Sequence, residues 1–189
     1  MSFNRNRSLV GALIYLTIGT RPDIDYAVQQ LSQFLDCYSF NHWNTAIRIV
    51  RYLKGTRNLQ LVLGGNGTIK LLGFSDSDWA NCPTTQRSIG AYTFSLGSGC
   101  VTWSVRKQKT VATSSCEAKY VAAFEATKEA LWICQLLNAI NIPPQDAMTI
   151  LCDNNTARSL LEDPMLHLRV KHMDIKYHFL RENVQDNKV

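Results

Sequence analysis

The sequence lacks the features of a membrane-spanning or secreted chain. Its longest apolar stretches, such as 9–16, fall well short of the roughly 20 consecutive residues that a membrane-spanning helix needs. Arg5 and Arg7 precede that stretch, but no small-residue cleavage pattern follows, so no signal peptide is predicted. Low-complexity tracts and internal repeats are also absent. We therefore expect an intracellular protein, cytoplasmic by default, with no membrane partner.

Metal and redox signatures built on cysteine or histidine are missing as well. None of the six cysteines forms a C-x-x-C pair, and His167, His172 and His178 have no convincing ligand spacing. Most of the cysteines lie inside apolar runs, which predicts buried free thiols in a reducing compartment.

The composition is that of a folded protein, and its charge is unevenly spread. Hydrophobic residues make up 46% of the chain and charged residues 19%, which argues against disorder. Residues 1–66 contain seven Lys/Arg against three Asp, whereas residues 67–189 contain thirteen basic residues against twelve acidic ones. The excess of positive charge in residues 1–66 favours an anionic partner such as nucleic acid.

Three short helices are predicted at the start of the chain, over 8–18, 22–35 and 41–54. Pro22 suits the first turn of the second helix, and Gly55 suits the end of the third. The third helix carries Arg48, Arg51 and Lys54 on one side. The spacing predicts that its inward residues are Trp43, Ala46, Ile47, Val50 and Leu53. This basic side is either an ordinary solvated helix face or a surface that binds along the phosphate backbone of a nucleic acid.

A glycine-rich turn at 64–67 marks the predicted domain boundary, giving domains 1–66 and 67–189, with a possible short strand at 59–63 before it. Strand 69–76 is apolar on both faces, as in a central strand, and 88–96 and 101–106 alternate as in an antiparallel meander. A helix over 114–138, a strand over 148–152, a short helix near 157–161 and a helix over 173–184 follow. The fold class predicted is therefore α/β: a mixed sheet of three antiparallel strands and a fourth, with flanking helices, after a small helical subdomain.

Three carboxylates fall at positions that can converge. Asp76 and Asp153 end two core strands, and Glu117 lies in the first turn of the long helix. If the strands are neighbours, the carboxylates meet at one rim of the sheet. Such a set of hard oxygen ligands suits Mg²⁺ or Mn²⁺ and would repel itself without cations.

Each carboxylate also has an ordinary structural explanation. Ser114 and Glu117 have the spacing of a capping box, in which the acid satisfies the helix N-terminus. Asp153 could cap the short helix that follows it, and Asp76 or Asp78 could open a turn.

The sequence resembles the Pol polyproteins of copia-type LTR retrotransposons over nearly its whole length. Residues 8–16, 20–24 and 51–56 resemble the thumb/connection end of the reverse transcriptase. The part resembling ribonuclease H carries Gly73-Phe74-Ser75-Asp76-Ser77-Asp78-Trp79-Ala80, Arg87-Ser88-Ile89-Gly90-Ala91-Tyr92, Trp103-Ser104, Lys107-Gln108, Glu117-Ala118-Lys119-Tyr120, Cys152-Asp153-Asn154 and Lys171-His172-Met173-Asp174.

This resemblance implies a ribonuclease H-like sheet with a parallel fourth strand, and cleavage of the RNA strand of RNA–DNA hybrids by two Mg²⁺ or Mn²⁺ ions. Asp76, Glu117 and Asp153 would be the catalytic metal ligands. Contacts to the hybrid would come from Ser77, Ser114, Ser115 and Asn154, through backbone and 2′-hydroxyl groups. The remainder of the polyprotein, with the reverse transcriptase palm, would be a further partner.

The sequence departs from the family pattern at two places that concern the site. The family's fourth Asp lies in a helix after a fifth strand, which this sequence does not reach, and Lys119 replaces a second acidic residue common in the helix motif. We therefore expect cleavage to be impaired or absent in this fragment. The alternative is a non-catalytic nucleic-acid-binding or unselected remnant of the polyprotein.

Overall fold

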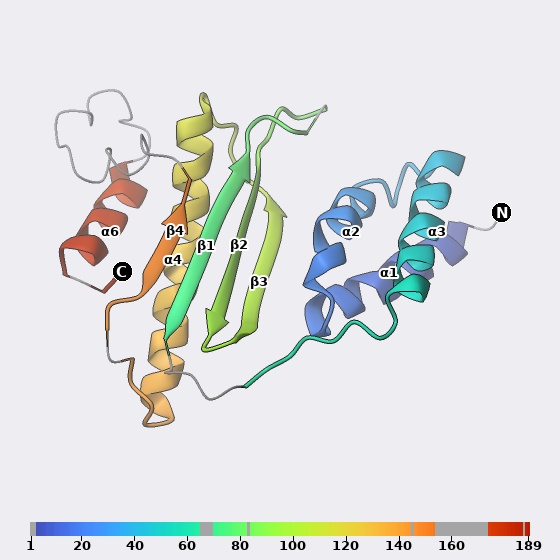
Figure 1. The fold of residues 1–189 in the computed structure, drawn as a ribbon. Coiled ribbons are helices and arrows are strands. Elements are labelled where there is room, and N and C mark those ends of the chain that lie inside the picture. Colours follow the sequence, from blue (N-terminus) through green and yellow to red (C-terminus); the bar gives the residue numbers. More distant parts are fainter. Residues whose placement is uncertain (1–2, 65–69, 83, 145, 154–173, 187) are drawn as a thin grey trace. The chain divides into compact units, whose positions relative to one another are not determined.

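The computed structural model describes residues 3–64, 70–82, 84–144, 146–153, 174–186 and 188–189 (Figure 1). The chain forms two compact units, Met1–Val62 and Leu63–Val189, and each is described by itself. The short helix predicted near 157–161 lies outside the described residues.

The first unit is helical, with α1 (Phe3–Gly19), a 3-10 turn η1 (Pro22–Ile24), α2 (Asp25–Ser32) and α3 (Phe40–Gly55). The predicted second helix is therefore split after its first turn and ends three residues early. The strand predicted over 59–63 is wrong, because none of these residues is in a strand. The core of this unit is formed by Val10, Leu13, Ile24, Val28, Leu31, Ala46 and Ile49.

The inward side of α3 differs in part from the prediction. Ala46 and Ile49 are buried, whereas Val50 is 37% exposed. Ala46, Ile49 and Leu53 are spaced as i, i+3 and i+7, and Leu53 packs against the same core. The apolar stripe that contacts α1 and α2 is thus rotated slightly from the predicted one.

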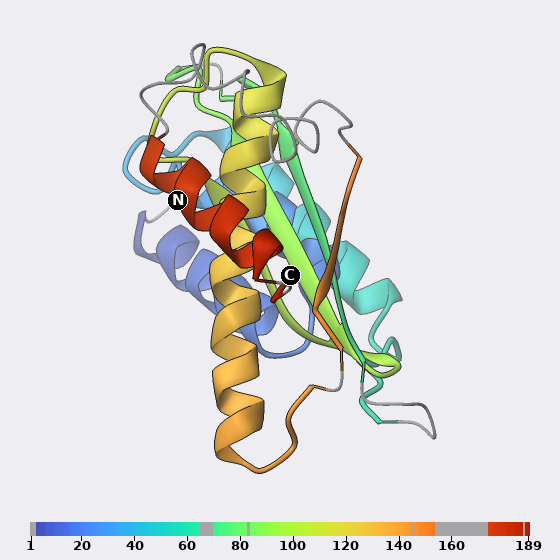
Figure 2. The ribbon, with the colours of Figure 1, turned by 90° about the vertical axis from the view of Figure 1, so that its left-hand side faces the viewer.

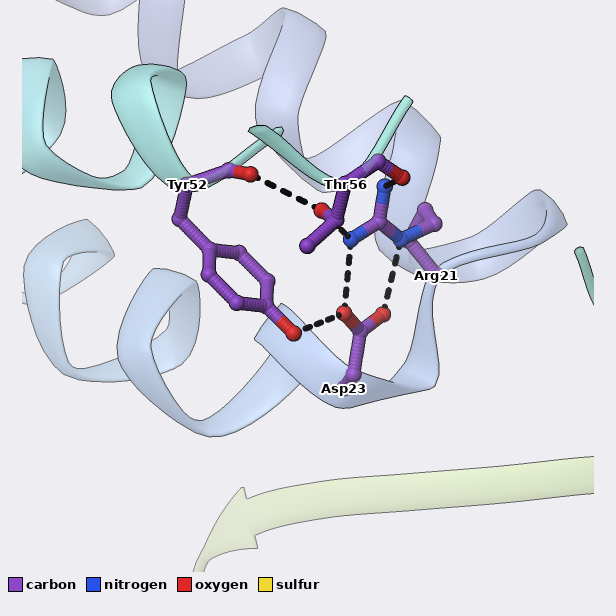
Figure 3. A network of polar contacts seen from close by, with 4 residues as sticks. All are labelled: Arg21, Asp23, Tyr52 and Thr56. Carbon is purple, nitrogen blue, oxygen red and sulfur yellow. Dashed lines mark hydrogen bonds and ion pairs between the residues drawn. The ribbon is translucent and has the colours of Figure 1, made fainter. Parts of the chain in front are cut away.

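A polar network links the start of η1 to the end of α3 (Figure 3). The guanidinium of Arg21 donates to both carboxylate oxygens of Asp23 at 2.9 and 2.7 Å, and to Thr56 Oγ1 at 2.7 Å. Tyr52 Oη donates to Asp23 Oδ2 at 2.9 Å. The hydrogen bonds from Arg21 are the main reason that the pKa of Asp23 lies below its ordinary value. Because Arg21 is only 8% exposed, this pair stabilises the packing of the two elements.

The second unit is a four-stranded mixed sheet with helices on one face. Its strands are β1 (Leu71–Asp78), β2 (Ile89–Leu96), β3 (Gly99–Lys107) and β4 (Thr149–Cys152), in the order β3-β2-β1-β4. The β1–β2 and β2–β3 pairs are antiparallel, and β1–β4 is parallel. Helix α4 (Ser115–Ala139) runs along one face, and α6 (Asp174–Gln185) packs against α4 (Figures 1 and 2). The predicted fold class, a ribonuclease H-like mixed sheet preceded by a helical subdomain, is confirmed.

Small residues allow α4 to lie close to the sheet. Buried alanines recur every four residues along one side of the helix, at Ala118, Ala122, Ala126 and Ala130. Gly90 of β2 faces them, since a Cβ added to it would lie 3.4 Å from the Cβ of Ala122. Close approach of helix and strand gives the dense packing typical of protein cores.

Strand β1 has one buried and one exposed face, so the prediction of two apolar faces is wrong. Leu71, Gly73, Ser75 and Ser77 are buried, whereas Phe74, Asp76 and Asp78 alternate with them and are exposed. The reason is that α4 covers only the side of the sheet toward which the first set points.

The cysteines are all free, but only Cys82 is buried, and Cys37 and Cys152 are exposed. The prediction of buried thiols is therefore wrong for most of them. In the described part of the chain, no helix has the length and apolar character needed to cross a membrane.

Candidate active site at the ends of two parallel strands

The parallel pairing of β1 with β4 brings two aspartates to the same edge of the sheet. Ser75 of β1 pairs with Cys152 of β4, so Asp76 and Asp153 are the next residue of each chain segment. Both side chains are about two-thirds exposed, at 64% and 66%. The convergence expected from the sequence is therefore present for these two carboxylates.

Lys119 lies between the two aspartates. Its Nζ is 3.4 Å from Asp76 Oδ1 and is in direct contact with Asp153 Oδ1. Its side chain is only 20% exposed, and the hydrogen bond to Asp153 is the main reason that its pKa lies above the ordinary lysine value. One ammonium thus joins the ends of β1 and β4 to the second turn of α4.

Asp76 is held by its own backbone as well. The N–H of Ser77 donates to Asp76 Oδ1 at 2.7 Å, so a single carboxylate oxygen faces both this N–H and Lys119. The neighbouring Asp78 has a different partner: its Oδ2 accepts a hydrogen bond from Asn81 Nδ2 at 3.0 Å. The exposed face of β1 therefore carries one carboxylate that belongs to the site and one that belongs to the following turn.

Glu117 is turned toward the start of α4. Its Oε2 accepts from the N–H and the Oγ1 of Thr113, each at 2.7 Å, and the residue is 6% exposed. Ser114 is the N-cap, and its Oγ accepts from the N–H of Glu117 at 3.1 Å. Of the capping box raised by the sequence, the bond to Ser114 is present, and the carboxylate of Glu117 bonds to Thr113, the residue before the N-cap.

The three predicted ligands are not gathered around one point. Within the described residues, no group of three or more His, Cys, Asp or Glu side chains is arranged to hold a metal ion. The donor chemistry suits Mg²⁺ or Mn²⁺, but the ammonium of Lys119 contacts the oxygens that such an ion would use. As arranged here, the residues do not fit a divalent ion.

The predicted hybrid-binding residues have different surroundings. Ser77 is buried at 6% exposure, with Gln108 Nε2 at 3.5 Å from its Oγ. Ser114 and Ser115 are exposed at the start of α4. Asn154 lies outside the described residues. Of the three that the structure describes, Ser114 and Ser115 are at the surface and Ser77 is not.

Two residues near the site carry roles that the sequence did not indicate. Gln108 is buried and donates to the carbonyl of Ala118 at 2.8 Å, which fixes the end of β3 against α4. Trp79 Nε1 donates to the carbonyl of Ala112 at 3.0 Å, which ties the end of β1 to the segment before α4. The sequence offered no clear signal for either residue, because Gln108 lies between Lys107 and Lys109 and Trp79 follows Asp78.

A basic cavity of about 480 Å³ lies between the sheet and the first half of α4. Its charged lining consists of one acidic residue, Glu125, and five basic ones: Arg106, Lys107, Lys109, Lys128 and Lys176. Glu125 is paired with Lys128 at 2.6 Å. The excess of positive charge favours an anionic ligand.

Comparison with known proteins gives relatives along most of the chain. It is 40% identical over 179 residues to a retrovirus-related Pol polyprotein from transposon RE2 of Arabidopsis thaliana, covering 95% of this chain. It is 38% identical over 182 residues to the corresponding polyprotein from transposon TNT 1-94 of Nicotiana tabacum, covering 96% of this chain. It spans only 12% and 14% of these two polyproteins.

A shorter relative is not named as a transposon polyprotein. Secreted RxLR effector protein 161 of Plasmopara viticola is 47% identical over 126 residues, which are 67% of this chain and 89% of that protein. No family model matches the sequence, and no solved structure matches the fold. The likeness to the two transposon polyproteins extends along nearly the whole chain. The chain belongs to the retrovirus-related Pol polyproteins of copia-type transposons.

Proposed function

We propose that residues 67–189 act as the ribonuclease H of a retrotransposon Pol polyprotein and cut the RNA strand of RNA–DNA hybrids. The observation that carries the proposal is the pair of carboxylates at the adjoining ends of β1 and β4, Asp76 and Asp153, in a sheet of this topology. Glu117 starts the helix that connects β3 to β4. Residues 1–66 would be the thumb/connection end of the reverse transcriptase.

The proposed cofactor is Mg²⁺ or Mn²⁺, because hard oxygen ligands at a strand edge suit these ions. Such ions would supply an activated water and would stabilise the leaving oxygen. For Asp76 and Asp153 to serve as ligands, Lys119 would have to leave their oxygens, and Glu117 would have to turn from Thr113. Of the two side chains that would have to move, Lys119 is 20% exposed and Glu117 is buried.

The basic cavity supports a hybrid as the substrate. Arg106 and Lys109 are exposed at its edge, and a nucleic-acid backbone would be attracted there by charge, without regard to sequence. The 2′-hydroxyl groups of the RNA strand would provide the means to distinguish a hybrid from a DNA duplex.

A non-catalytic nucleic-acid-binding function is the second candidate, and one observation favours it. Arg48, Arg51 and Lys54 are all exposed on α3, and their spacing of three residues places them along one side of the helix. This function predicts hybrid binding that weakens with salt and with neutralisation of these three residues, and that is unchanged in Asp76→Asn.

Substrate selectivity tests the proposed function. The chain is incubated with Mn²⁺ or Mg²⁺ and an end-labelled RNA paired to DNA, and then with the same RNA paired to RNA, with single-stranded RNA and with a DNA duplex. We expect slow cleavage, with RNA fragments released from the hybrid alone, because Lys119 occupies the oxygens of Asp76 and Asp153. Equal cutting of single-stranded RNA, or intact hybrid RNA in the presence of both metals, would contradict the proposal.

A further inference from the structure

The position between Asp76 and Asp153 is taken by a cation that belongs to the chain itself. Lys119 Nζ contacts both carboxylates, at 3.4 Å from Asp76 Oδ1 and more closely at Asp153 Oδ1. The two acids come from the ends of different strands, and the lysine comes from α4. Its side chain is shielded to 20% exposure, whereas both acids are about two-thirds exposed.

The need for a cation at this point follows from the sheet topology. The parallel register leaves one carboxylate at the end of each of two adjacent strands, and two such groups repel each other unless a positive charge lies between them. Lys119 supplies one positive charge against two negative ones. Asp76, Asp153 and Lys119 together therefore keep a net negative charge and still attract a second cation.

A divalent ion and the ammonium cannot both occupy the same oxygens. Two positive charges within a few ångströms repel strongly at a partly buried site, and the carboxylate oxygen of Asp76 that faces Lys119 already accepts from the N–H of Ser77. Binding of an ion to both aspartates therefore requires the lysine to leave.

We infer that Lys119 is a tethered cation that holds Asp76 and Asp153 together in the metal-free chain and competes with divalent ions for them. Lys119 thereby sets the concentration of divalent ion at which the site fills. The inference rests on the proposed function in taking these two aspartates as the metal-binding pair. It explains why the site does not fit a metal although Asp76 and Asp153 converge.

The test measures Mn²⁺ binding by isothermal titration calorimetry, with the full chain and without nucleic acid. Lys119→Met removes the tethered charge, and Lys128→Met is the matched control. Lys128 lies on the same helix and pairs with Glu125 at 2.6 Å, so its loss removes the same positive charge but an ion pair that does not involve Asp76 or Asp153. We expect Lys119→Met to bind Mn²⁺ at least about fivefold more tightly than the unchanged chain, a size typical of breaking partly exposed ion pairs. Lys128→Met should bind as the unchanged chain does.

Lys119→Arg separates charge from packing, because it keeps a positive charge at the same place. It should bind Mn²⁺ like the unchanged chain. The shift of the melting temperature on adding saturating Mn²⁺ gives a second reading, which should be larger for Lys119→Met than for the unchanged chain.

The inference is overturned if Lys119→Met binds Mn²⁺ no more tightly than the unchanged chain, if Lys119→Arg gains as much as Lys119→Met, or if none of the variants binds Mn²⁺. Should Lys119→Met not fold, Lys119→Gln takes its place, with the same expected gain. Failure of the proposed function gives a different pattern: tighter Mn²⁺ binding in Lys119→Met, with hybrid RNA left intact by every variant.

Discussion

Cys152 of β4 pairs with Ser75 of β1 in the parallel ladder, and this register decides where the acids of the site lie. A shift by one residue would turn one of the two following aspartates to the opposite face of the sheet. With the observed register, Asp76 and Asp153 both reach Lys119. The chemistry of the site therefore depends on the pairing of the two residues that directly precede its aspartates.

The packing of β1 against β2 gives a first prediction. A Cβ added to Gly73 would lie 2.3 Å from a ring carbon of Phe94, which is fully buried. Gly73→Ala should therefore reduce the free energy of unfolding by about 2 kcal/mol, since an overpacked core must shift. Urea denaturation followed by tryptophan fluorescence measures this change. Gly90→Ala is the control, because its nearest contacts are at 3.4 Å, and equal losses in the two variants would contradict the packing argument.

The network in Figure 3 gives a prediction for the helical unit. Asp23→Asn removes the charge that pairs with the nearly buried Arg21, and should cost about 2 kcal/mol of stability. Asp36→Asn is the control. It breaks the ion pair with Arg7, in which both side chains are at least half exposed, so its cost should be small.

The same carboxylate gives a pH dependence with a definite sign. The pKa of Asp23 in the folded chain is lowered, chiefly by Arg21, from the ordinary value of 3.8. Its stabilising contribution is therefore complete above pH 3.8 and is lost as the pH falls from there through the folded pKa. The difference in unfolding free energy between the unchanged chain and Asp23→Asn should shrink over that range. A difference that stays constant down to the lowest pH measured would contradict this assignment.

Two variants at the start of α4 separate capping from catalysis. Ser114→Ala removes the N-cap that accepts from Glu117 N–H, and should cost about 1 kcal/mol of stability while cleavage at saturating hybrid is retained. Glu117→Gln should also lower stability, and in addition should abolish cleavage under conditions where the variant is folded. If Glu117→Gln cuts hybrid RNA at the unchanged rate, Glu117 is only a cap.

The basic cavity gives a prediction for binding. Lys109→Gln removes an exposed charge at its edge. It should weaken hybrid binding to a similar degree for all sequences, and should lower the slope of log affinity against log salt by about one. Lys70→Gln is the control, because Lys70 is exposed at the start of β1 and does not line the cavity. Equal weakening by both variants would argue for general charge attraction without a defined cavity.

Much of the fold could be predicted because the residue pattern within each segment and the connections between segments indicate the same arrangement. Alternating residues in 88–96 and 101–106 predicted a meander, and the long helix before the strand ending in Cys152 predicted a parallel crossover. The convergence of Asp76 and Asp153 was predicted on the condition that their strands are neighbours, which β1 and β4 are. The predictions of the helix ends and of the inward side of α3 were less accurate. On α3, Ile49 and Val50 are equally apolar, so only packing decides which one is buried.

The arrangement inside the site could not be predicted, since it depends on which partner each side chain finds. Glu117 has the spacing of both a metal ligand and a helix cap, and its carboxylate bonds to Thr113 in the segment before the helix. Lys119 was visible only as a departure from the family pattern. Its bridging of two strand ends depends on the distance between α4 and the sheet, which follows from the buried alanines of the helix.

The most direct measurement of the central claim compares two neighbouring aspartates of β1 in hybrid cleavage. Asp76→Asn and Asp78→Asn make the same chemical change two residues apart on the same exposed face, but only Asp76 contacts Lys119. Single-turnover cleavage of labelled hybrid RNA is measured for the unchanged chain and both variants at saturating Mn²⁺. The account predicts loss of cleavage in Asp76→Asn and a nearly unchanged rate in Asp78→Asn. Cleavage that persists in Asp76→Asn, or that is lost equally in both variants, would contradict it.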